Sequence, residues 1–150
     1  METKKNEKIA DLLNILLADE SVLYLKTRNY HWNVKGPNFY SLHNLFEVQY
    51  EELAVMIDDI AEHIRQLGHY AVATMGDYLK STNLLETAHG NLDEKTMLQN
   101  LVNDHNTIIR ILTNDLGKSE DLKDTITVDF ITTLTEKHQK MAWMLQASIA

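Results

Sequence analysis

The sequence predicts an all-α protein whose single domain is a bundle of four long helices. Only 5 glycines and 1 proline occur in 150 residues, which is too few for the many turns of a β-sheet protein. Between these breaks, apolar residues recur at helical spacing in four long stretches. A chain of this length forms one domain with its own core, so residues 1–150 are expected to fold as one unit.

The first two helices are predicted on either side of the break at Gly36–Pro37. The first spans about Asn6–Asn33 and leaves residues 1–6 as a short N-terminal tail. The second spans about Phe39–Leu67, with Asn38 as its N-cap. Because the break between them is short, the two helices are expected to lie antiparallel.

The last two helices are predicted on either side of Gly117. The third spans about Leu92–Leu116, where Asn91 and Glu94 resemble a capping box and Gly117 suits the C-terminal cap. The fourth spans about Leu122–Ser148. Here too the short connection predicts antiparallel neighbours.

The connection between the second and third helices is too long for a simple turn. Its central segment, MGDYLKS, is expected to form a short helix. Four helices with one long crossover have the topology of a ferritin-like bundle. The predicted fold class is therefore all-α, a ferritin-like four-helix bundle with a short extra helix in the long middle connection.

The composition excludes several classes of function. The chain has no cysteine, and so no disulfide, thiolate metal site or cysteine nucleophile. Its 14 Lys and Arg against 22 Asp and Glu give a net charge of -8, which disfavours general nucleic-acid binding and favours attraction of cations. No apolar run resembles a membrane span or a secretory signal, so a cytoplasmic location is expected.

Histidine and carboxylates share one face of the second helix. At 3.6 residues per turn, its members lie within about 100° of one another; they are His43, Glu47, Glu51, Asp58 and Glu62. A solvated acidic face is one interpretation. The same residue types also suit a divalent metal such as Fe(II), and His31 would lie beside His43 in a hairpin. The other histidines are expected to be ordinary surface or core residues: His63, His69, His89, His105 and His138.

Distance along the helix divides these residues between two chains. His43 and Asp58 lie 15 residues apart, or about 22 Å, and ligands with bonds of about 2 Å cannot close that gap. One chain therefore supplies a histidine half-site (His31 and His43) and a carboxylate half-site (Asp58 and Glu62). The halves meet if two chains pair antiparallel through this helix, with a two-fold axis near Glu51–Leu53 and two equivalent sites.

An iron site inside one bundle is not expected. Di-iron sites of that kind use Glu-x-x-His pairs from two helices. No glutamate of the second helix has a histidine three residues later. The expected site therefore differs from that of an ordinary ferritin, although the topology is the same.

The stretch from Thr27 to Gly68 resembles the signature region of the Dps family, the mini-ferritins named as DNA-binding proteins from starved cells. It contains His-Trp, a Gly-Pro-Asn-Phe turn and a second histidine 12 residues after the first. Asp and Glu follow 15 and 19 residues after that second histidine. The ending QKMAWMLQ is similar to the family's last helix, so the resemblance covers nearly the whole chain.

The resemblance implies a hollow shell of twelve subunits that oxidises Fe(II), usually with hydrogen peroxide, and stores ferric mineral. It implies a two-iron ferroxidase site with His31 and His43 from one chain and Asp58 and Glu62 from its two-fold partner. Family members often carry Asp where this chain has Glu47. We expect Glu47 to hydrogen-bond a ligand or a bound water, or to hold a weaker metal position.

Two further roles carry alternative interpretations. Trp32, next to His31, would intercept a radical formed at the site, or would only pack in the interface. The resemblance implies that acids near the start of the last helix line three-fold pores for iron entry; these are Asp121, Asp124 and Asp129, with Asp121 and Asp129 favoured. Acids near a helix N-terminus are also ordinary partners of the helix dipole.

DNA binding, from which the family takes its name, has less support in this sequence. The basic residues near the N-terminus are Lys4, Lys5 and Lys8, diluted by Glu2 and Glu7. Twelve acidic chains would repel DNA, although clustered lysine tails act together through multivalency. Nucleoid protection through these lysines is therefore the second hypothesis. A third is a helical oligomer without redox chemistry, whose acidic stripe is only a polar interface.

Overall fold

Five α-helices make up the regular structure of the described part of the chain. The computed structural model describes residues 2–88 and 90–149. Its helices are α1 (Glu2–Asn33), α2 (Phe39–Gln66), α3 (Met75–Ser81), α4 (Glu94–Asp121) and α5 (Thr125–Ala147). No strand occurs in these two ranges. The all-α prediction is confirmed, and MGDYLKS forms the expected short helix.

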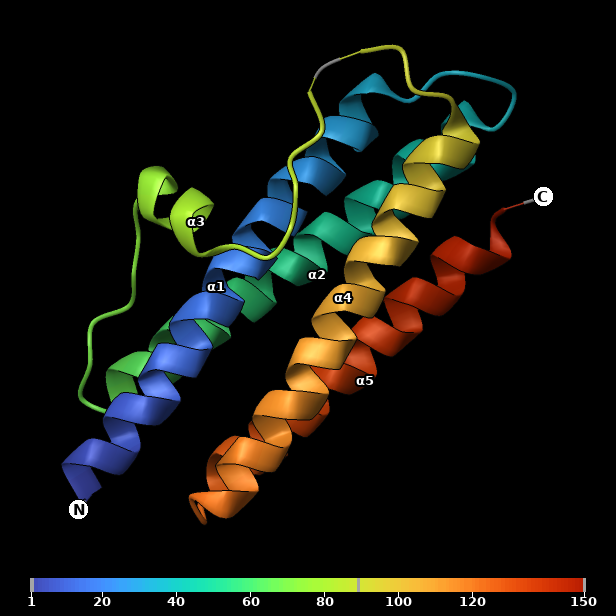
Figure 1. Ribbon diagram of the computed structural model, residues 1–150. Helices are drawn as coiled ribbons and strands as arrows, with labels where there is room; N and C mark the ends of the chain where they lie inside the picture. Colours follow the sequence, from blue (N-terminus) through green and yellow to red (C-terminus); the bar gives the residue numbers. More distant parts are fainter. Residues whose placement is uncertain (1, 89, 150) are drawn as a thin grey trace.

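The four long helices form two antiparallel hairpins that pack against each other (Figure 1). α1 pairs with α2, and α4 pairs with α5. α2 and α4 run in the same direction, so the connection between them crosses the length of the bundle (Figure 1). α3 lies within this connection, on the outside of α1. The predicted ferritin-like topology with one long crossover is confirmed.

Apolar side chains from all four long helices fill the centre of the bundle. Representative residues, each at most 2% exposed, are Leu13, Phe46, Leu101 and Leu134. Each long helix thus buries one stripe at helical spacing, as an amphipathic helix does. Among the described residues, no helix is both long and apolar enough to cross a membrane.

The ends of α4 differ from the sequence prediction. Asp93 is its N-cap, because its carboxylate accepts a hydrogen bond from the Thr96 N–H at 2.7 Å. The capping box expected at Asn91–Glu94 therefore does not form. Gly117 lies inside the helix rather than at its end, and α4 continues to Asp121. At the N-terminal end the Asp93 carboxylate is thus the cap in place of Asn91, and at the C-terminal end a glycine alone does not stop the helix.

Buried polar contacts hold the long connection against the bundle. The Asp19 carboxylate on α1 accepts hydrogen bonds from the Thr82 hydroxyl at 2.7 Å and the Asn83 N–H at 2.6 Å. Lys26 forms an ion pair with Asp104 of α4 at 2.8 Å and donates a hydrogen bond to a carbonyl of the connection. These contacts anchor the segment between α3 and α4 on α1.

Candidate metal centre

The turn between α1 and α2 positions the two histidines of the predicted half-site. Gly36 in this turn has a φ of 133°, which residues with a side chain rarely adopt. The Glu94 carboxylate on α4 accepts hydrogen bonds from the Asn38 N–H at 3.0 Å and the Asn38 side-chain amide at 2.9 Å. A Cβ at Gly36 would collide with that carboxylate. Glycine therefore permits the close approach that fixes the hairpin.

His31 and His43 form a stacked pair across this hairpin. Their ring centroids lie 3.8 Å apart with 15° between the planes. Nδ1 of each ring lies 2.7 Å from the backbone carbonyl oxygen of the other residue. A carbonyl oxygen only accepts, so each Nδ1 carries the proton and, in the neutral ring, each Nε2 is left unprotonated. This tautomer is the one in which Nε2 can bind a metal ion.

Asp58 and Glu62 form the second predicted pair, one turn apart on α2. Both side chains are exposed, and a hydrogen bond joins them. That hydrogen bond, together with the negative charge of Asp58, raises the pKa of Glu62. Two carboxylates that converge in this way attract a cation, because its positive charge offsets their mutual repulsion.

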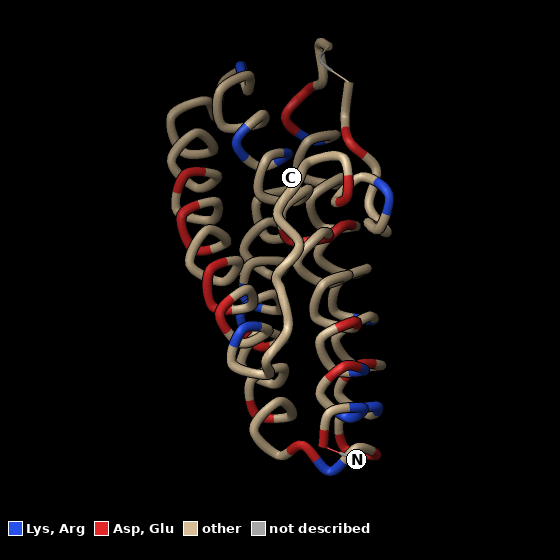
Figure 2. The backbone as a smooth tube through the Cα atoms, turned by 90° about the vertical axis from the view of Figure 1, so that its left-hand side faces the viewer, with Lys and Arg blue, Asp and Glu red and all other residues tan. Residues whose placement is uncertain are grey.

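His43 and the carboxylate pair occupy opposite halves of α2, as their spacing predicts, and His31 of α1 lies beside His43. Within the described residues, no group of three His, Asp or Glu side chains converges enough to hold a metal ion. Glu47 lies one turn after His43 and is half-buried, and Glu51 is exposed near the middle of the helix. Acidic positions thus recur along the length of α2 (Figure 2), and one chain presents two separate half-sites.

Two residues beside the histidine pair, Tyr50 and Arg28, were not among the predicted site residues. Tyr50 meets the His31 ring edge-on, with 5.2 Å between the ring centroids. The Arg28 guanidinium lies 4.8 Å from the Tyr50 ring centroid and 4.9 Å from that of Trp32. The signal was present, because Tyr50 follows His43 by two helical turns and so shares its face. Trp32, the expected radical trap, is 57% exposed.

A second histidine pair lies at the centre of the bundle. His138 Nε2 contacts both oxygens of Glu20, at 2.8 and 2.9 Å, and its Nδ1 lies 2.8 Å from Nδ1 of His105. All three side chains are fully buried. Burial, and then the neighbouring His138, lower the pKa of His105 well below its ordinary value. The chain also contains a Glu-x-x-His spacing, Glu86–His89; Glu86 lies in the connection before α4, and His89 lies outside the described residues.

The three acids expected at an iron-entry pore lie around the corner between α4 and α5. Asp121 is the last residue of α4, and Asp129 is exposed on α5. α5 begins at Thr125, later than predicted, because Asp124 is its N-cap and accepts the Thr127 N–H at 3.1 Å. Asp124 is only 9% exposed, so its carboxylate serves the helix end, whereas the other two acids face solvent.

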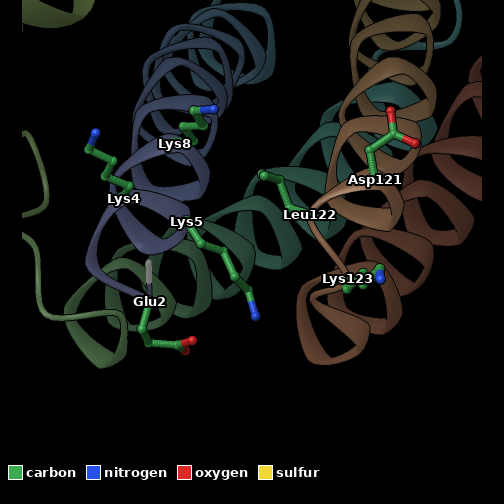
Figure 3. Close-up of a pocket in the computed structure, with 7 residues that line it drawn as sticks. All are labelled: Glu2, Lys4, Lys5, Lys8, Asp121, Leu122 and Lys123. Carbon is green, nitrogen blue, oxygen red and sulfur yellow. The ribbon is translucent and has the colours of Figure 1, made fainter.

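Lysines from the start of α1 line a hollow beside this corner (Figure 3). α1 begins at Glu2 rather than at Asn6, so these lysines lie on a helix and not in a tail. The hollow has a volume of about 640 Å³ and is lined by four basic, two acidic and one apolar residue: Glu2, Lys4, Lys5, Lys8, Asp121, Leu122 and Lys123. Basic positions accordingly gather near the N-terminus (Figure 2).

Comparisons with known proteins agree with the helical fold. Residues 10–150 match the family model described as a ferritin-like domain. The chain is 43% identical to a low temperature-induced protein of Nostoc sp., covering 97% of this chain and 82% of that one. It is 37% identical to DNA protection during starvation protein 2 of Bacillus anthracis, covering 95% and 97%. Among solved structures, the chain matches the crystal structure of a Dps protein from Vibrio cholerae with a TM-score of 0.94 and 31% identity, covering 99% of this chain and 92% of that one. That protein is described as a member of a broad superfamily of ferritin-like diiron-carboxylate proteins. The chain therefore belongs to the Dps family of ferritin-like proteins.

Proposed function

We propose that this protein is an iron-storing ferroxidase that oxidises Fe(II) with hydrogen peroxide, deposits ferric mineral inside a hollow dodecamer and so protects against oxidative damage. Membership of the Dps family supports iron storage and protection in general terms. The observation that carries the proposal is the reciprocal hydrogen bonding of His31 and His43, which in the neutral rings leaves both Nε2 atoms free to bind a metal ion. Fe(II) is the substrate of this pair.

The site we propose is shared by two subunits and takes two irons. His31 and His43 come from one subunit and Asp58 and Glu62 from its two-fold partner, because about 22 Å of helix separates the pairs in one chain. Glu47, one turn from His43, would support a ligand or a weaker second metal position. The same dimer holds two such sites.

Two exposed valines of α2 support the same pairing. Val48 is 58% exposed and Val55 is 56% exposed, which leaves apolar surface open on this face. The midpoint between them falls between residues 51 and 52. The midpoint between His43 and the carboxylate pair falls at the same place. One antiparallel two-fold axis would therefore bury the valines against each other and bring the half-sites together.

The ligand set fits oxidation of Fe(II) to Fe(III). Neutral imidazoles and carboxylates bind Fe(II), and the carboxylate charge stabilises the more highly charged Fe(III) still more. Two Fe(II) give one electron each to one peroxide, which takes up two protons and leaves as two waters. Oxidising the irons in pairs therefore releases no hydroxyl radical.

Iron would reach the interior of the shell through acidic three-fold pores. Asp121 and Asp129 are exposed near the α4–α5 corner, and a ring of three such carboxylates would concentrate cations. Asp124 is the third pore residue we propose, although its carboxylate also caps α5. The assembled shell would be located in the cytoplasm.

The direct test is anaerobic loading of the purified protein with Fe(II), followed by hydrogen peroxide. We expect about two Fe(II) oxidised per peroxide and a soluble iron-filled particle, as two-electron reduction requires. Gel filtration of the loaded sample should place iron and protein in one peak at the mass of twelve chains. Iron oxidation no faster than in buffer alone would contradict the proposal.

The lysine-lined hollow supports a second function, which is protection of the nucleoid by direct DNA binding. Lys4, Lys5 and Lys8 stand beside Lys123 there, so four positive charges are available to phosphates. The net charge of -8 per chain opposes the binding, because a dodecamer would carry roughly twelve times that charge. A gel shift at low and moderate salt, with Lys4→Gln/Lys5→Gln as comparison, tests it. Any shift should weaken with salt and disappear in the double variant.

A further inference from the structure

An acid from the second hairpin holds the turn between α1 and α2. Glu94 is the first residue of α4, and the turn lies beside it at the same end of the bundle (Figure 1). One Glu94 carboxylate oxygen accepts the Asn38 backbone N–H at 3.0 Å, and the other accepts the Asn38 side-chain amide at 2.9 Å. These two residues are 56 positions apart in the chain. Their contact therefore joins the two hairpins at the end of the bundle that carries the rim histidines.

Asn38 makes this contact instead of capping α2. An asparagine just before a helix usually accepts a hydrogen bond from one of the first helical N–H groups. The side chain of Asn38 makes no such bond, whereas the residues at the same position of α3, α4 and α5 each make one: Thr74, Asp93 and Asp124. A missing cap destabilises a helix. The Asn38 side chain is thus committed to holding the start of α2 against α4.

The start of α2 is linked directly to the position of His43. The Asn38 carbonyl accepts the Leu42 N–H at 3.0 Å, and His43 is the next residue along the helix. A shift of Asn38 is therefore transmitted through one helical turn to His43. The His31 and His43 rings each bond the backbone of the other residue at 2.7 Å, so such a shift also changes the relative placement of their two Nε2 atoms.

We infer that Glu94 is a positioning residue for the histidine half-site. Through Asn38 it fixes where α2 begins, and so holds the Nε2 atoms of His31 and His43 in place for one metal ion. Glu94 acts through Asn38 and not as a ligand. This inference rests on the proposed function, which makes the histidine pair a metal site. A contact that served only the stability of the fold would leave metal affinity unchanged when it is lost.

The experiment titrates the assembled protein with Co(II), a divalent metal of similar ligand preference to Fe(II), and follows its visible absorption. Glu94→Gln keeps the size of the side chain but turns an amide NH₂ toward a donor of Asn38. Asn38→Asp sets a second carboxylate against Glu94, although Asp can still cap α2. We expect each variant to bind Co(II) about ten-fold more weakly, as loss of an indirect support of a metal ligand does, and with an altered spectrum. The melting temperature of Asn38→Asp should change little.

The double variant Asn38→Asp/Glu94→Gln tests the contact itself, because it exchanges donor and acceptor. The new amide can accept the backbone N–H with its oxygen and donate to the new carboxylate, so Co(II) affinity and spectrum should largely recover. Glu136→Gln removes an exposed carboxylate of α5 and should change neither. Unchanged Co(II) affinity in both single variants would overturn the inference, and so would additive losses in the double variant. Absence of Co(II) binding that is lost in His31→Ala/His43→Ala would instead contradict the proposed site.

Discussion

The protein contains two histidine pairs, one near the rim of the bundle and one at its centre, and their hydrogen bonds differ. At the rim, each Nδ1 of His31 and His43 donates to a backbone carbonyl of the other residue. At the centre, the two Nδ1 atoms of His105 and His138 face each other, and His138 Nε2 contacts Glu20. Both pairs join neighbouring helices, yet only the rim pair retains two free nitrogens.

The comparison shows that partner atoms, rather than burial alone, decide what a histidine can do. His31 is only 6% exposed, close to the 0% of His105. Because carbonyl oxygens hold the Nδ1 protons at the rim, Nε2 keeps its lone pair for a metal. At the centre, His105 Nε2 has no hydrogen-bond partner among the described residues and is buried away from solvent, so a ligand could reach it only by opening the core.

The largest expected effect is loss of iron chemistry without loss of fold when the carboxylate half-site is removed. Asp58→Ala/Glu62→Ala should slow peroxide-driven Fe(II) oxidation by at least about 100-fold, because even indirect supports of metal ligands cost 10–100-fold when removed. Stopped-flow absorbance of Fe(III) measures the rate. Asp59→Ala, which removes an exposed neighbouring carboxylate, should keep most of the activity.

A mixing experiment sharpens this result by testing whether the half-sites come from different chains. His31→Ala/His43→Ala protein and Asp58→Ala/Glu62→Ala protein are each expected to be inactive. Unfolded together and refolded, they should recover about a quarter of the unmodified activity, because half of the random dimers contain one intact site of two. Full inactivity of the refolded mixture, with normal assembly, would place the site within one chain.

The central pair should show the opposite response, with a loss of stability and little change in chemistry. Glu20→Ala leaves the buried His138 Nε2 without its acceptor and opens a small cavity, which should cost about 3 kcal/mol of unfolding free energy. Chemical denaturation measures the loss. Glu20→Gln keeps an acceptor and should lose less. The assembled Glu20→Ala protein should still oxidise iron at nearly the unmodified rate, and a large decrease would give the centre a role in catalysis.

The pH dependence of stability separates the pairs further. The pKa of His105 is lower in the folded protein than in the unfolded chain. Below the unfolded pKa of about 6.5, the unfolded chain therefore binds a proton at this histidine that the folded protein does not bind. Stability from this group is therefore complete above that pH and falls as the pH drops, by up to about 1.4 kcal/mol per unit. Burial raises the pKa of Asp115 to about 6, which acts in the opposite sense. The measurement is therefore the free energy of unfolding at a series of pH values, compared between the unmodified protein and His105→Gln. The His105→Gln profile should be flatter on the acid side.

The smallest expected effect concerns the turn that carries the rim pair. Gly36→Ala places a methyl group against Glu94 at a φ of 133°, which should cost about 1–2 kcal/mol of stability. Iron oxidation should slow only a few-fold, because the two carbonyl hydrogen bonds still hold the rings. Gly76→Ala has open space for its methyl group and should leave both quantities nearly unchanged.

Much of the fold and of the proposed site follows from local patterns. Helical period and rise are set by near-neighbour geometry, so the sequence alone predicted four long helices, the short helix of MGDYLKS and the shared face of His43, Asp58 and Glu62. The same rise determined that one chain could not close a site with those residues. Helix ends were less predictable, since Asn91, Asp93 and Glu94 all resemble capping residues and only the folded chain selects Asp93.

Only the tertiary structure decided the hydrogen-bond partners of the two histidine pairs. The contact of His138 with Glu20 joins residues 118 positions apart, and no periodicity relates them. Whether Nδ1 of His31 faces a carbonyl or another ring depends on how two helices pack, as does the position of Arg28 over Tyr50. Spacing along a helix determined which residues could meet, because a helix is a local structure. Packing between helices determined which atoms of those residues met, because hydrogen bonds depend on atomic positions that distant segments set together.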